Sequence, residues 1–433
     1  MIYTVIIAIL TCISLILSII FFPKIKVFNK QINTYWLIGL LGAILMLLFG
    51  SISVKDAFNG LFSDSSINPI KILILFISMT LLSVFLDEVG FFKTLAMFAT
   101  KKAKSNQKAL FFILYAVVSI LTIFTSNDIV ILTFTPFICY FAKNTKINPI
   151  PYLVAEFVGA NTWSMMLIIG NPTNIFLATS ANIEFIEYLK IMFIPTLLAG
   201  ICEILILYIL FNKKLKEPLV CEYEEQKFNE KTSIIIGLVH LLICLVLLVI
   251  SSYINIPMYL ICLCCAISLV LLISVINIIS KKKFSNIKNT FKRLPYELIP
   301  FVLSMFIIVL SLQKQGVTNY FSNILGEKMI IGKYGISSFL FCNIINNIPM
   351  SVLFSQIPQF TNQLQFSQAI FSTIIGSNLG AFVTPIGALA GIMFTGLVND
   401  QDVKFSFKTF IKYGVIISIP TLAAALIGLS IVL

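Results

Sequence analysis

Residues 109–142 read ALFFILYAVVSILTIFTSNDIVILTFTPFICYFA, an apolar run interrupted once, by Thr125-Ser126-Asn127-Asp128. The run is too long for a single crossing helix, because about 20 residues span a bilayer. Lys108 precedes the run and Lys143 follows it, and both belong to the lysine-rich gaps described below. Since lysine-rich gaps share one side of a membrane, the run is predicted to enter and leave on that side. We therefore expect a re-entrant helical hairpin with a polar tip.

The composition predicts an all-α polytopic membrane protein. Of the 433 residues, 59% are apolar and 11% are charged, and the mean hydropathy is +1.01. A soluble chain is about half apolar and a quarter charged, so an ordinary cytosolic protein is excluded. The apolar runs do not alternate as in a membrane β-barrel. The net charge of +12 comes from residues between apolar spans, which indicates orientation in a lipid bilayer and no nucleic-acid partner.

The apolar spans suggest the layout of the chain. At a rise of 1.5 Å per residue, most of them suit one crossing each. Predicted single crossings lie at 2–22, 34–51, 70–89, 190–212, 233–252, 256–280, 297–313 and 409–432. Longer or irregular segments lie at 109–142, 149–182, 331–357 and 367–397.

The basic residues indicate which side each gap faces. Of the 30 lysine and arginine residues, 24 lie in the gaps at 24–30, 93–108, 143–146, 213–231, 281–293 and 404–412. The other six are Lys55, Lys71, Lys190, Lys314, Lys328 and Lys333, which lie in the alternate gaps. By the positive-inside rule, the rich gaps are predicted to be cytoplasmic in a multi-pass protein of the plasma membrane.

A second hairpin is predicted at 331–357, approached from the opposite side, with its polar break at Asn346-Asn347-Ile348-Pro349. Two halves, 1–212 and 233–433, then each hold five crossings and one hairpin, joined by a cytoplasmic linker at 213–232. Because five is odd, the halves begin on opposite sides of the membrane. This is the inverted-topology repeat found in many secondary transporters.

Matching motifs follow the two hairpins. Asn161 in Gly159-Ala160-Asn161 precedes Gly170 by nine residues, and Asn378 in Gly376-Ser377-Asn378 precedes Gly387 by nine. Each motif leads into a polar stretch rich in Gly and Pro, 169–174 or 384–387. Gly and Pro interrupt the helical hydrogen bonds. We expect broken helices whose half-helix ends meet a polar solute or ion inside the membrane.

A carboxylate inside a membrane span costs free energy, so its presence there indicates a functional role. Asp128 lies at the first hairpin tip and is the leading candidate for coupling to Na⁺ or H⁺. Glu156, five residues before Asn161, is the second candidate. Glu203 lies in mid-span away from the motifs, and for it interhelix packing and transport both stay open. His240 is predicted to be a packing residue.

The motifs also limit the chemistry. They contain no Lys or Arg, so an anion would be held by helix ends, amides and hydroxyls, and a neutral hydroxide such as arsenous acid also fits. No resident cofactor or metal site is predicted; the only metal expected is a transported cation. One histidine and unpaired Asp128 disfavour an intramembrane enzyme, and two oppositely oriented hairpins favour a carrier over a channel.

The motifs together resemble those of the ion transporter superfamily. They are Ser126-Asn127-Asp128, Gly170-Asn171-Pro172-Thr173-Asn174, Asn346-Asn347-Ile348-Pro349, Gly376-Ser377-Asn378-Leu379-Gly380 and Thr384-Pro385-Ile386-Gly387. The arsenite permease and sodium/proton antiporter branch is most similar, and the divalent-anion/sodium symporters are more distant. The resemblance covers nearly the whole chain.

This resemblance implies a homodimer in which a mobile part, with both hairpins and both broken helices, moves like an elevator against a scaffold. It implies a small ion or anion as substrate: an arsenite-like oxyanion, Na⁺ exchanged for H⁺, or a carboxylate carried with sodium. The first tip reads Ser-Asn-Asp and the second Asn-Asn-Ile-Pro, unlike the Ser-Asn-Thr of the dicarboxylate branch, which argues against a dicarboxylate. The implied substrate- and ion-binding residues are Ser126, Asn127, Asp128, Asn161, Gly170, Asn171, Thr173, Asn174, Asn346, Asn347, Ser377, Asn378, Thr384 and Gly387.

Overall fold

The computed structural model describes residues 2–22, 24–27, 30–62, 68–103, 106–216, 230–281, 283–358, 360–401 and 403–433. The first half contains α1 (Ile2–Phe21), β1 (Lys24–Val27), β2 (Lys30–Asn33), α2 (Tyr35–Leu48), α3 (Val54–Phe62), α4 (Pro69–Glu88), α5 (Phe91–Ala103), α6 (Gln107–Phe124), α7 (Asn127–Thr145), α8 (Ile150–Trp163), η1 (Ser164–Met166), η2 (Ile168–Gly170), α9 (Pro172–Ser180), α10 (Phe185–Phe211) and η3 (Lys214–Lys216). The second half contains α11 (Lys231–Val249), α12 (Ser251–Ile254), α13 (Met258–Ile279), α14 (Ser285–Arg293), α15 (Leu298–Lys314), α16 (Val317–Leu325), α17 (Ile330–Ile345), α18 (Asn347–Phe354), α19 (Gln363–Gly380), α20 (Leu389–Asp400) and α21 (Phe407–Val432).

The helical membrane architecture predicted from composition is confirmed. Among the described residues, eight helical segments are long and apolar enough to cross a membrane. Two of these helices begin with an asparagine cap: Asn68 accepts hydrogen bonds from the first amides of α4, and Asn106 does the same for α6. Such caps satisfy amides that have no partner inside the helix. Much of the predicted linker, residues 217–229, lies outside the described residues, so the linker stays a prediction.

The predicted gaps contain structure that hydrophobicity did not indicate. β1 and β2 form an antiparallel hairpin directly after α1. α3, α5, α14 and α16 are short helices between the predicted spans. Their apolar residues occupy one side only, as Val54 and Phe58 do in α3, so the average hydropathy of each segment is low. α2, with 14 residues, is also shorter than the predicted span at 34–51.

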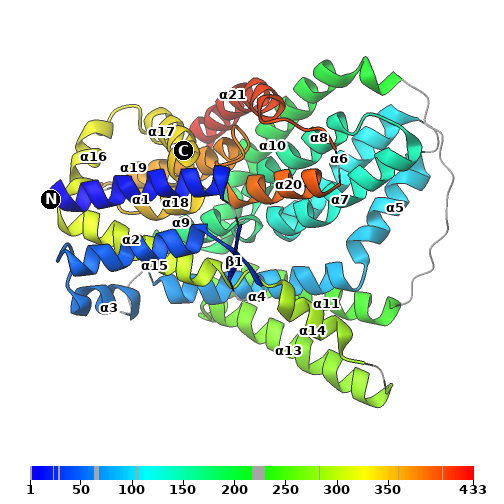
Figure 1. Ribbon diagram of the computed structural model, residues 1–433, viewed down its shortest axis with the longest axis horizontal. Helices are drawn as coiled ribbons and strands as arrows, with labels where there is room; N and C mark the ends of the chain where they lie inside the picture. Colours follow the sequence, from blue (N-terminus) through cyan, green and yellow to red (C-terminus); the bar gives the residue numbers. More distant parts are fainter. Residues whose placement is uncertain are drawn as a thin grey trace.

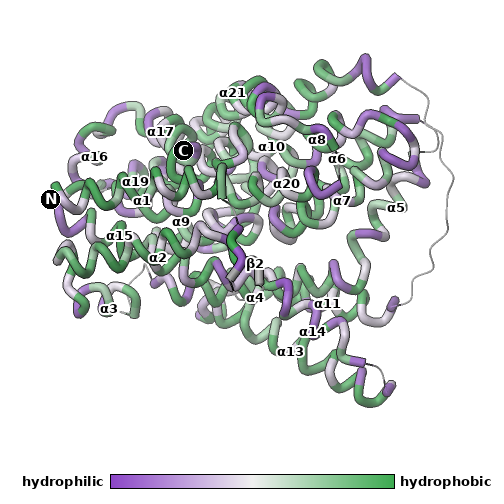
Figure 2. The backbone as a smooth tube through the Cα atoms, viewed as in Figure 1, coloured by the Kyte–Doolittle hydropathy of each residue, from purple (hydrophilic) through white to green (hydrophobic). Residues whose placement is uncertain are grey.

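The helices form two packed groups (Figure 1). The peripheral group consists of α1, α2, α4, α11, α13 and α15, in which α13 packs on α4 and α15 packs on α2. The hairpin group consists of α6–α10 and α17–α21, in which α19 packs on α17 and α21 packs along α10. Figure 2 shows hydrophobic stretches along α1, α13 and α15, and hydrophilic residues near α14 and around α5 and α7.

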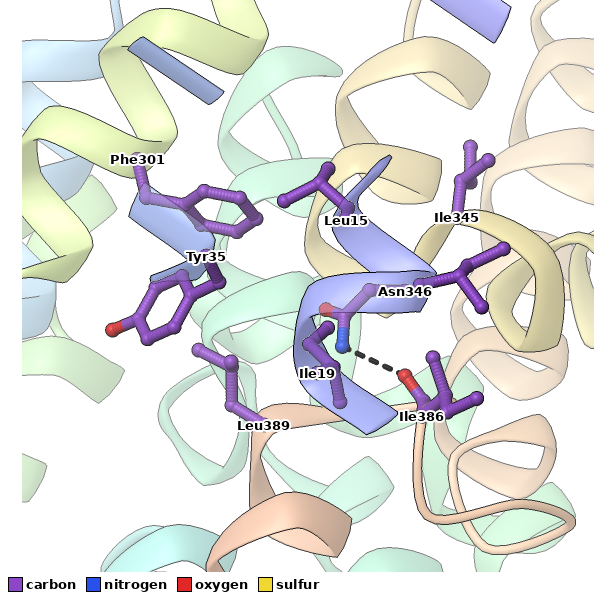
Figure 3. A pocket seen from close by; sticks show the side chains of 9 residues that line it. Leu15, Ile19, Tyr35, Phe301, Ile345, Asn346, Ile386 and Leu389 are labelled. Carbon is purple, nitrogen blue, oxygen red and sulfur yellow. Dashed lines mark hydrogen bonds between the residues drawn. The ribbon is translucent and has the colours of Figure 1, made fainter. Parts of the chain in front are cut away.

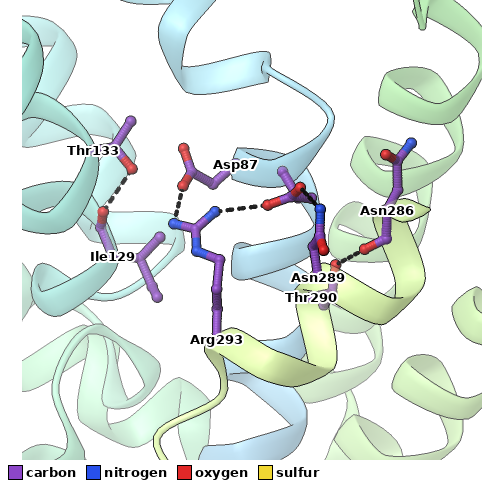
Figure 4. Close-up of polar contacts among 8 residues, drawn as sticks. Asp87, Ile129, Thr133, Asn286, Asn289, Thr290 and Arg293 are labelled. Atoms are coloured by element: carbon purple, nitrogen blue, oxygen red, sulfur yellow. Dashed lines mark hydrogen bonds and ion pairs between the residues drawn. The ribbon is translucent and has the colours of Figure 1, made fainter. Parts of the chain in front are cut away.

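The chain's one arginine joins α14 to the end of α4 (Figure 4). Arg293 forms ion pairs with Asp87 and, at 3.1 Å, with Glu88. Asn289 Nδ2 donates to the same Glu88 at 2.8 Å. α4 ends at Glu88, and α5 begins three residues later, at Phe91. Gly90 between them has a φ of +87°, a conformation that glycine adopts at little cost. The cluster therefore holds α14 against α4 where the chain leaves the peripheral group toward α6.

A second ion pair lies between α3 and the end of α15. Asp56 pairs with Lys314, and Ser53 Oγ donates to Asp56 Oδ2 at 2.6 Å. The hydrogen bonds from Lys314 and Ser53 hold the pKa of Asp56 below its ordinary value. The pair links the short helix α3 to a membrane-spanning helix.

The contacts of the histidine agree with the packing role predicted for it, and the cysteines also pack between helices. His240 Nδ1 lies 2.8 Å from Ile236 O, and its Nε2 lies 3.0 Å from Ser268 Oγ. The cysteines among the described residues are free thiols. Cys244 Sγ packs 3.8 Å from Cys262 Sγ, between α11 and α13. Among the described residues, no group of three His, Cys, Asp or Glu side chains is arranged to hold a metal ion.

Candidate functional site

The antiparallel helix pair of the first predicted hairpin is present, as the contacts of α6 and α7 with α8 demonstrate, whereas its re-entrant course in the membrane stays a prediction. On α6, Gln107 contacts Tyr152, whereas Tyr115 contacts Trp163, so α6 runs parallel to α8. On α7, Asn127 contacts Asn161, whereas Thr135 contacts Glu156, so α7 runs antiparallel to α8. The two arms are therefore antiparallel to each other, and the chain returns to the side from which it came.

The tip of this hairpin places buried amide and hydroxyl groups between two helix ends. Thr125 Oγ1 bonds back to Leu121 O at 2.7 Å and ends α6. Asn127 Nδ2 donates to Asn161 Oδ1 at 3.1 Å, and Asn127 Oδ1 accepts from the Asp128 amide at 2.9 Å. Ser126 is buried between them, and its Oγ has no hydrogen-bond partner among the described residues.

The second predicted hairpin is also present. α17 runs parallel to α19, because Gly335 and Ser338 approach Gly376 while Cys342 approaches Gly380. α18 folds back on α17, with the Phe341 and Phe354 rings 5.7 Å apart. A Cβ at Gly376 would overlap Ser338 Oγ and the Gly335 carbonyl, so glycine permits this close approach of α17 and α19.

The second tip is a strained turn held by hydrogen bonds. Asn346 has φ +71° and ψ 152°, a conformation that costs about 1–3 kcal/mol for a residue other than glycine. Its Nδ2 donates to Ile386 O at 2.9 Å, and the Asn347 amide donates to Gly387 O at 2.9 Å. Asn347 Oδ1 is buried and, like Ser126 Oγ, has no partner among the described residues.

Both predicted broken helices are present. After α8, the two 3₁₀ turns η1 and η2 lead to Asn171, which caps α9 by accepting from the Thr173 amide at 3.1 Å and Thr173 Oγ1 at 3.0 Å. A Cβ at Gly170 would overlap the backbone of Ser164. After α19, residues 381–388 are non-helical, and Thr384 Oγ1 donates to Asn343 Oδ1 at 2.7 Å.

Asn378 joins the two halves of the chain at the centre of the hairpin group. Its Oδ1 accepts from Ser164 Oγ and Asn171 Nδ2, both at 2.9 Å. Its Nδ2 donates to Asn174 Oδ1 at 2.7 Å and to Ile374 O at 2.8 Å. The amide is fully buried, and its donors and acceptors are occupied by protein groups.

A chain of contacts leads from one tip to the other. Ser164 Oγ lies 2.7 Å from the Asn161 carbonyl and 2.9 Å from Asn378 Oδ1, so its single O–H can be shared between them and links the first tip to the second half. Ser377, beside Asn378, lies 3.5 Å from Ser351 Oγ, which in turn donates to the Asn347 carbonyl at 2.8 Å. This chain of contacts runs from Asn127, the neighbour of Ser126, to Asn347, so the unpartnered Ser126 Oγ and Asn347 Oδ1 belong to residues at or next to its two ends.

The carboxylates occupy different places. Asp128 is half-buried beside the first tip, and its carboxylate has no hydrogen-bond or ion-pair partner among the described residues. Tyr35 of α2 lies within electrostatic range of it. Glu156 of α8 is buried beside Thr135, which lies about two turns along α7 from the tip. Thr135 Oγ1 lies 3.1 Å from both carboxylate oxygens of Glu156. Glu156 therefore touches neither tip directly.

Two small cavities lie between the hairpin group and the peripheral group, which are otherwise in contact. The first is lined by Leu15, Ile16, Ile19, Tyr35, Phe301, Ile345, Asn346, Ile386 and Leu389 (Figure 3). The second is lined by Ile72, Leu73, Phe76, Pro172, Thr173, Phe176, Leu298, Val302, Ile348 and Ser351. Nearly every side chain that the peripheral group contributes is apolar. The polar lining residues, Asn346, Thr173 and Ser351, come from the hairpin group, apart from Tyr35.

The structure thus brings the predicted site residues of both halves into one region, although their roles in binding stay predictions. Sequence reasoning missed Ser164, Asn343 and Ser351, which hold this region together. Asn343 had a signal, since it is an amide within the apolar run of α17, one turn before Asn346. Ser164 and Ser351 had none beyond being hydroxyls near motifs.

Comparison with known proteins identifies the relatives. The model of a citrate transporter family, CitMHS, matches residues 27–368. An arsenical pump membrane protein of Escherichia coli is 25% identical over 423 residues, covering 91% of this chain and 93% of that protein. A protein of the same description from Yersinia enterocolitica is 26% identical over 381 residues, covering 83% of this chain and 86% of that protein.

Solved structures share the fold. The YdaH transporter of Alcanivorax borkumensis superposes with a TM-score of 0.58 at 12% identity, covering 99% of this chain and 97% of that chain. MtrF of Neisseria gonorrhoeae, from a class of antimetabolite efflux pumps, superposes with a TM-score of 0.52 at 13% identity, covering 99% and 94%. At such low identity the likeness concerns the fold alone.

Proposed function

Because the chain belongs to the CitMHS citrate transporter family of membrane transporters, we propose that it is a secondary transporter of a small inorganic hydroxide or oxyanion. Trivalent arsenic or antimony, as the neutral hydroxide, is the preferred substrate in this proposal. Relatives described as arsenical pump membrane proteins, aligned along about nine-tenths of both chains, support this choice.

The observation that carries the proposal is the pair of unpartnered polar atoms at the two tips. Ser126 Oγ can donate and accept, and Asn347 Oδ1 can accept. No Lys or Arg lies in the tip and broken-helix motifs. A neutral hydroxide offers O–H donors and oxygen acceptors to such groups and needs no cationic partner.

Asp128 is the first candidate for coupling substrate transport to the movement of an ion, and Glu156 is the second candidate. A carboxylate near the membrane centre, with no cationic partner, binds a proton or a sodium ion more readily than it stays bare. The half-buried position of Asp128, beside the tip, lets a cation reach it together with the substrate. In this proposal H⁺ or Na⁺ is the coupling ion.

Movement of the hairpin group against the peripheral group, as an elevator, is proposed as the transport step. The lining of the two small cavities supports this proposal (Figure 3). The peripheral group contributes mainly apolar side chains there, and the hairpin group could slide along such a surface. The proposal includes an inverted repeat, a homodimer and cytoplasmic lysine-rich loops in the plasma membrane. In support of the repeat, α10 and α21 follow equivalent hairpins and run in opposite directions in Figure 1.

A second candidate is a sodium-coupled carboxylate symporter, which the description of the family model favours. A citrate-like anion carries several negative charges, and arginine or lysine usually recognises such groups. Since the motif regions contain neither residue, this candidate requires bound cations to neutralise the anion.

The test uses purified protein and measures binding of arsenite, antimonite and citrate to the wild type and to Ser126→Ala and Asn347→Ala. Neither Ser126 Oγ nor Asn347 Oδ1 has a partner among the described residues, so both variants should keep their thermal stability. Each should lose about 1–3 kcal/mol of arsenite binding, roughly a five- to 150-fold loss of affinity.

Ser418→Ala is the matched control, because Ser418 Oγ is another buried hydroxyl without a partner among the described residues and belongs to α21, which forms neither tip. It should bind like the wild type. Tight binding of citrate with no binding of arsenite or antimonite would replace the preferred substrate by the second candidate. Unchanged arsenite affinity in both tip variants would contradict the site.

A further inference from the structure

A buried carboxyl group in α10 forms a polar cluster that the proposed site does not use. Glu203 lies in the middle of this 27-residue helix and is completely buried. Tyr115 OH of α6 donates to its Oε1 at 3.0 Å, and Thr162 Oγ1 of α8 contacts its Oε2. Trp163 Nε1 donates to the same tyrosine hydroxyl at 2.9 Å. The cluster connects three helices of the hairpin group.

Glycines make room for this cluster. A Cβ at Gly159 would lie 3.0 Å from the ring of Tyr115. A Cβ at Gly200 would overlap the indole of Trp163, and the Gly200 carbonyl lies 3.4 Å from Tyr115 OH. Because both positions lack a side chain, the ring of Tyr115 can reach Glu203, and the indole of Trp163 can reach the Tyr115 hydroxyl.

The groups around Glu203 offer it donors but no positive charge. Tyr115 of α6 and Thr162 of α8 contact it. The other titratable side chains of these two helices are Lys108, Tyr152 and Glu156. On its own helix the neighbouring titratable group is Cys202. The titratable residues of the packed helices α11 and α21 are Lys231, His240, Cys244, Lys408, Lys412 and Tyr413.

Two lysines of the neighbouring helices contact aromatic rings: Lys108 Nζ lies over Tyr208, and Lys412 Nζ lies over Tyr413. His240 bonds Ile236 and Ser268 within the peripheral group, and Tyr413 packs on Phe211, eight residues along α10 from Glu203. No ion pair of Glu203 is present among the described residues. Since a bare carboxylate inside a membrane without a cation is strongly disfavoured, Glu203 holds a proton in this arrangement.

The cluster is mechanically connected to the first hairpin tip. Thr162 directly follows Asn161, whose side-chain Oδ1 accepts a hydrogen bond from Asn127 Nδ2 at the tip. Tyr115 belongs to α6, the arm that leads into the tip. Removing the proton would place a negative charge against Thr162 and Tyr115. The contacts of α6 through Tyr115, and of α7 through the neighbouring Asn161, would then rearrange.

We infer that Glu203 is a proton-binding site that couples protonation to the position of the first hairpin, through Thr162 and Tyr115. The inference rests on the proposed transport function. In each cycle the Glu203 carboxylate takes up one proton from water on one side of the membrane and releases it to water on the other, and the O–H bond is the only covalent bond made and broken at this site.

The first measurement does not need a substrate. Infrared spectra of the purified protein, recorded against pH, should contain a carbonyl band of a buried carboxylic acid that is missing from Glu203→Gln. The band should disappear on titration to alkaline pH. Glu184→Gln, at an exposed glutamate just before α10, should retain it. If Glu203→Gln does not fold, Tyr115→Phe and Thr162→Val should shift the pH midpoint of the band.

The second measurement uses proteoliposomes and arsenite. A gradient of about one pH unit drives at most a tenfold accumulation per coupled proton. Glu203→Gln should keep measurable arsenite exchange between equal pools but lose accumulation driven by the gradient, whereas Glu184→Gln should retain both. A purely structural role would change stability without separating exchange from accumulation.

Two results would overturn the inference: a Glu203 band that does not titrate, or gradient-driven accumulation that survives in Glu203→Gln. Failure of the proposed function looks different. In that case the wild type neither binds nor exchanges arsenite, while the infrared titration still reports whether Glu203 exchanges its proton.

Discussion

Asn378 Nδ2 donates a 2.7 Å hydrogen bond to Asn174 Oδ1, across 204 residues of sequence. One asparagine lies in α19 of the second half and the other in α9 of the first. Together with the bonds from Ser164 and Asn171 to Asn378 Oδ1, this contact makes the two broken helices one unit. Whatever moves one broken helix must therefore move the other.

Replacing Asn378 by Ala should destabilise the protein more than replacing Asn161. Asn378→Ala leaves Asn171 Nδ2 and Asn174 Oδ1 unpaired, whereas Asn161→Ala leaves Asn127 Nδ2. Each unpaired buried group costs about 1–3 kcal/mol. Thermal unfolding in detergent should rank the two variants in this order. Arsenite affinity, measured in parallel, decides whether either amide also contacts the substrate; equal melting temperatures would contradict the ranking.

Gly376→Ala should destabilise the hairpin group. The added methyl group would overlap Ser338 and the backbone of α17, and such overpacking costs about 1–3 kcal/mol. Gly396→Ala in α20 is the control, because nothing lies within 4 Å of the Cβ position there. Alanine has the higher helix propensity, so this variant should be as stable as the wild type or slightly more so. Equal losses in both variants would mean that α17 can move aside.

Asp128→Asn should abolish coupled transport while the protein still folds. The substitution keeps the size of the side chain, and the carboxylate has no protein partner to lose. Uptake of arsenite driven by a pH or sodium gradient is the measurement, with circular dichroism and melting as checks of folding. Asp56→Asn, at an exposed aspartate, should transport normally. Unchanged gradient-driven uptake in Asp128→Asn would remove this residue from coupling.

A cross-link between the two groups of helices should stop transport. Leu15 of the peripheral group and Ile345 of the hairpin group line the same cavity (Figure 3). Cysteines at these positions, in a background without the native cysteines, should block transport once joined by a short bifunctional reagent. Cysteines at Leu15 and Tyr35, which line the same cavity but both belong to the peripheral group, should leave transport intact. Activity that survives the first cross-link would exclude an elevator movement at this boundary.

The ion pair of Asp56 should make a pH-dependent contribution to stability. The folded-state pKa is lowered by Lys314 and Ser53, so the contribution is present above the ordinary pKa of aspartate. It is lost as the pH falls through the lowered value. The melting temperatures of wild type and Asp56→Asn should therefore differ at neutral pH and converge in acid. High salt should also reduce the difference, because the pair is exposed; a difference that persists in acid would assign it to other contacts.

Much of the fold was predictable because the signals are local. The polar break at 125–128 in an apolar run, with Lys108 and Lys143 on either side, predicted the first hairpin, and the antiparallel arms of α6 and α7 agree. Gly170 and Gly387 predicted the breaks, since glycine and proline interrupt a helix wherever it packs. The short helices α5, α14 and α16 were missed because each has one apolar side and a low average hydropathy.

By itself, the sequence determined the membrane class, the two hairpins and the two broken helices, because hydrophobic length and helix-breaking residues act within one segment. Only the tertiary structure decided which polar atoms pair. Asn161 and Asn378 occupy matching positions in their motifs, yet Asn378 spans both halves while Asn161 bonds the first tip. Glu203, distant from every motif in sequence, contacts Thr162 beside Asn161. The physical reason is that an amide or carboxyl group can accept many partners, and only the packing of remote helices selects among them.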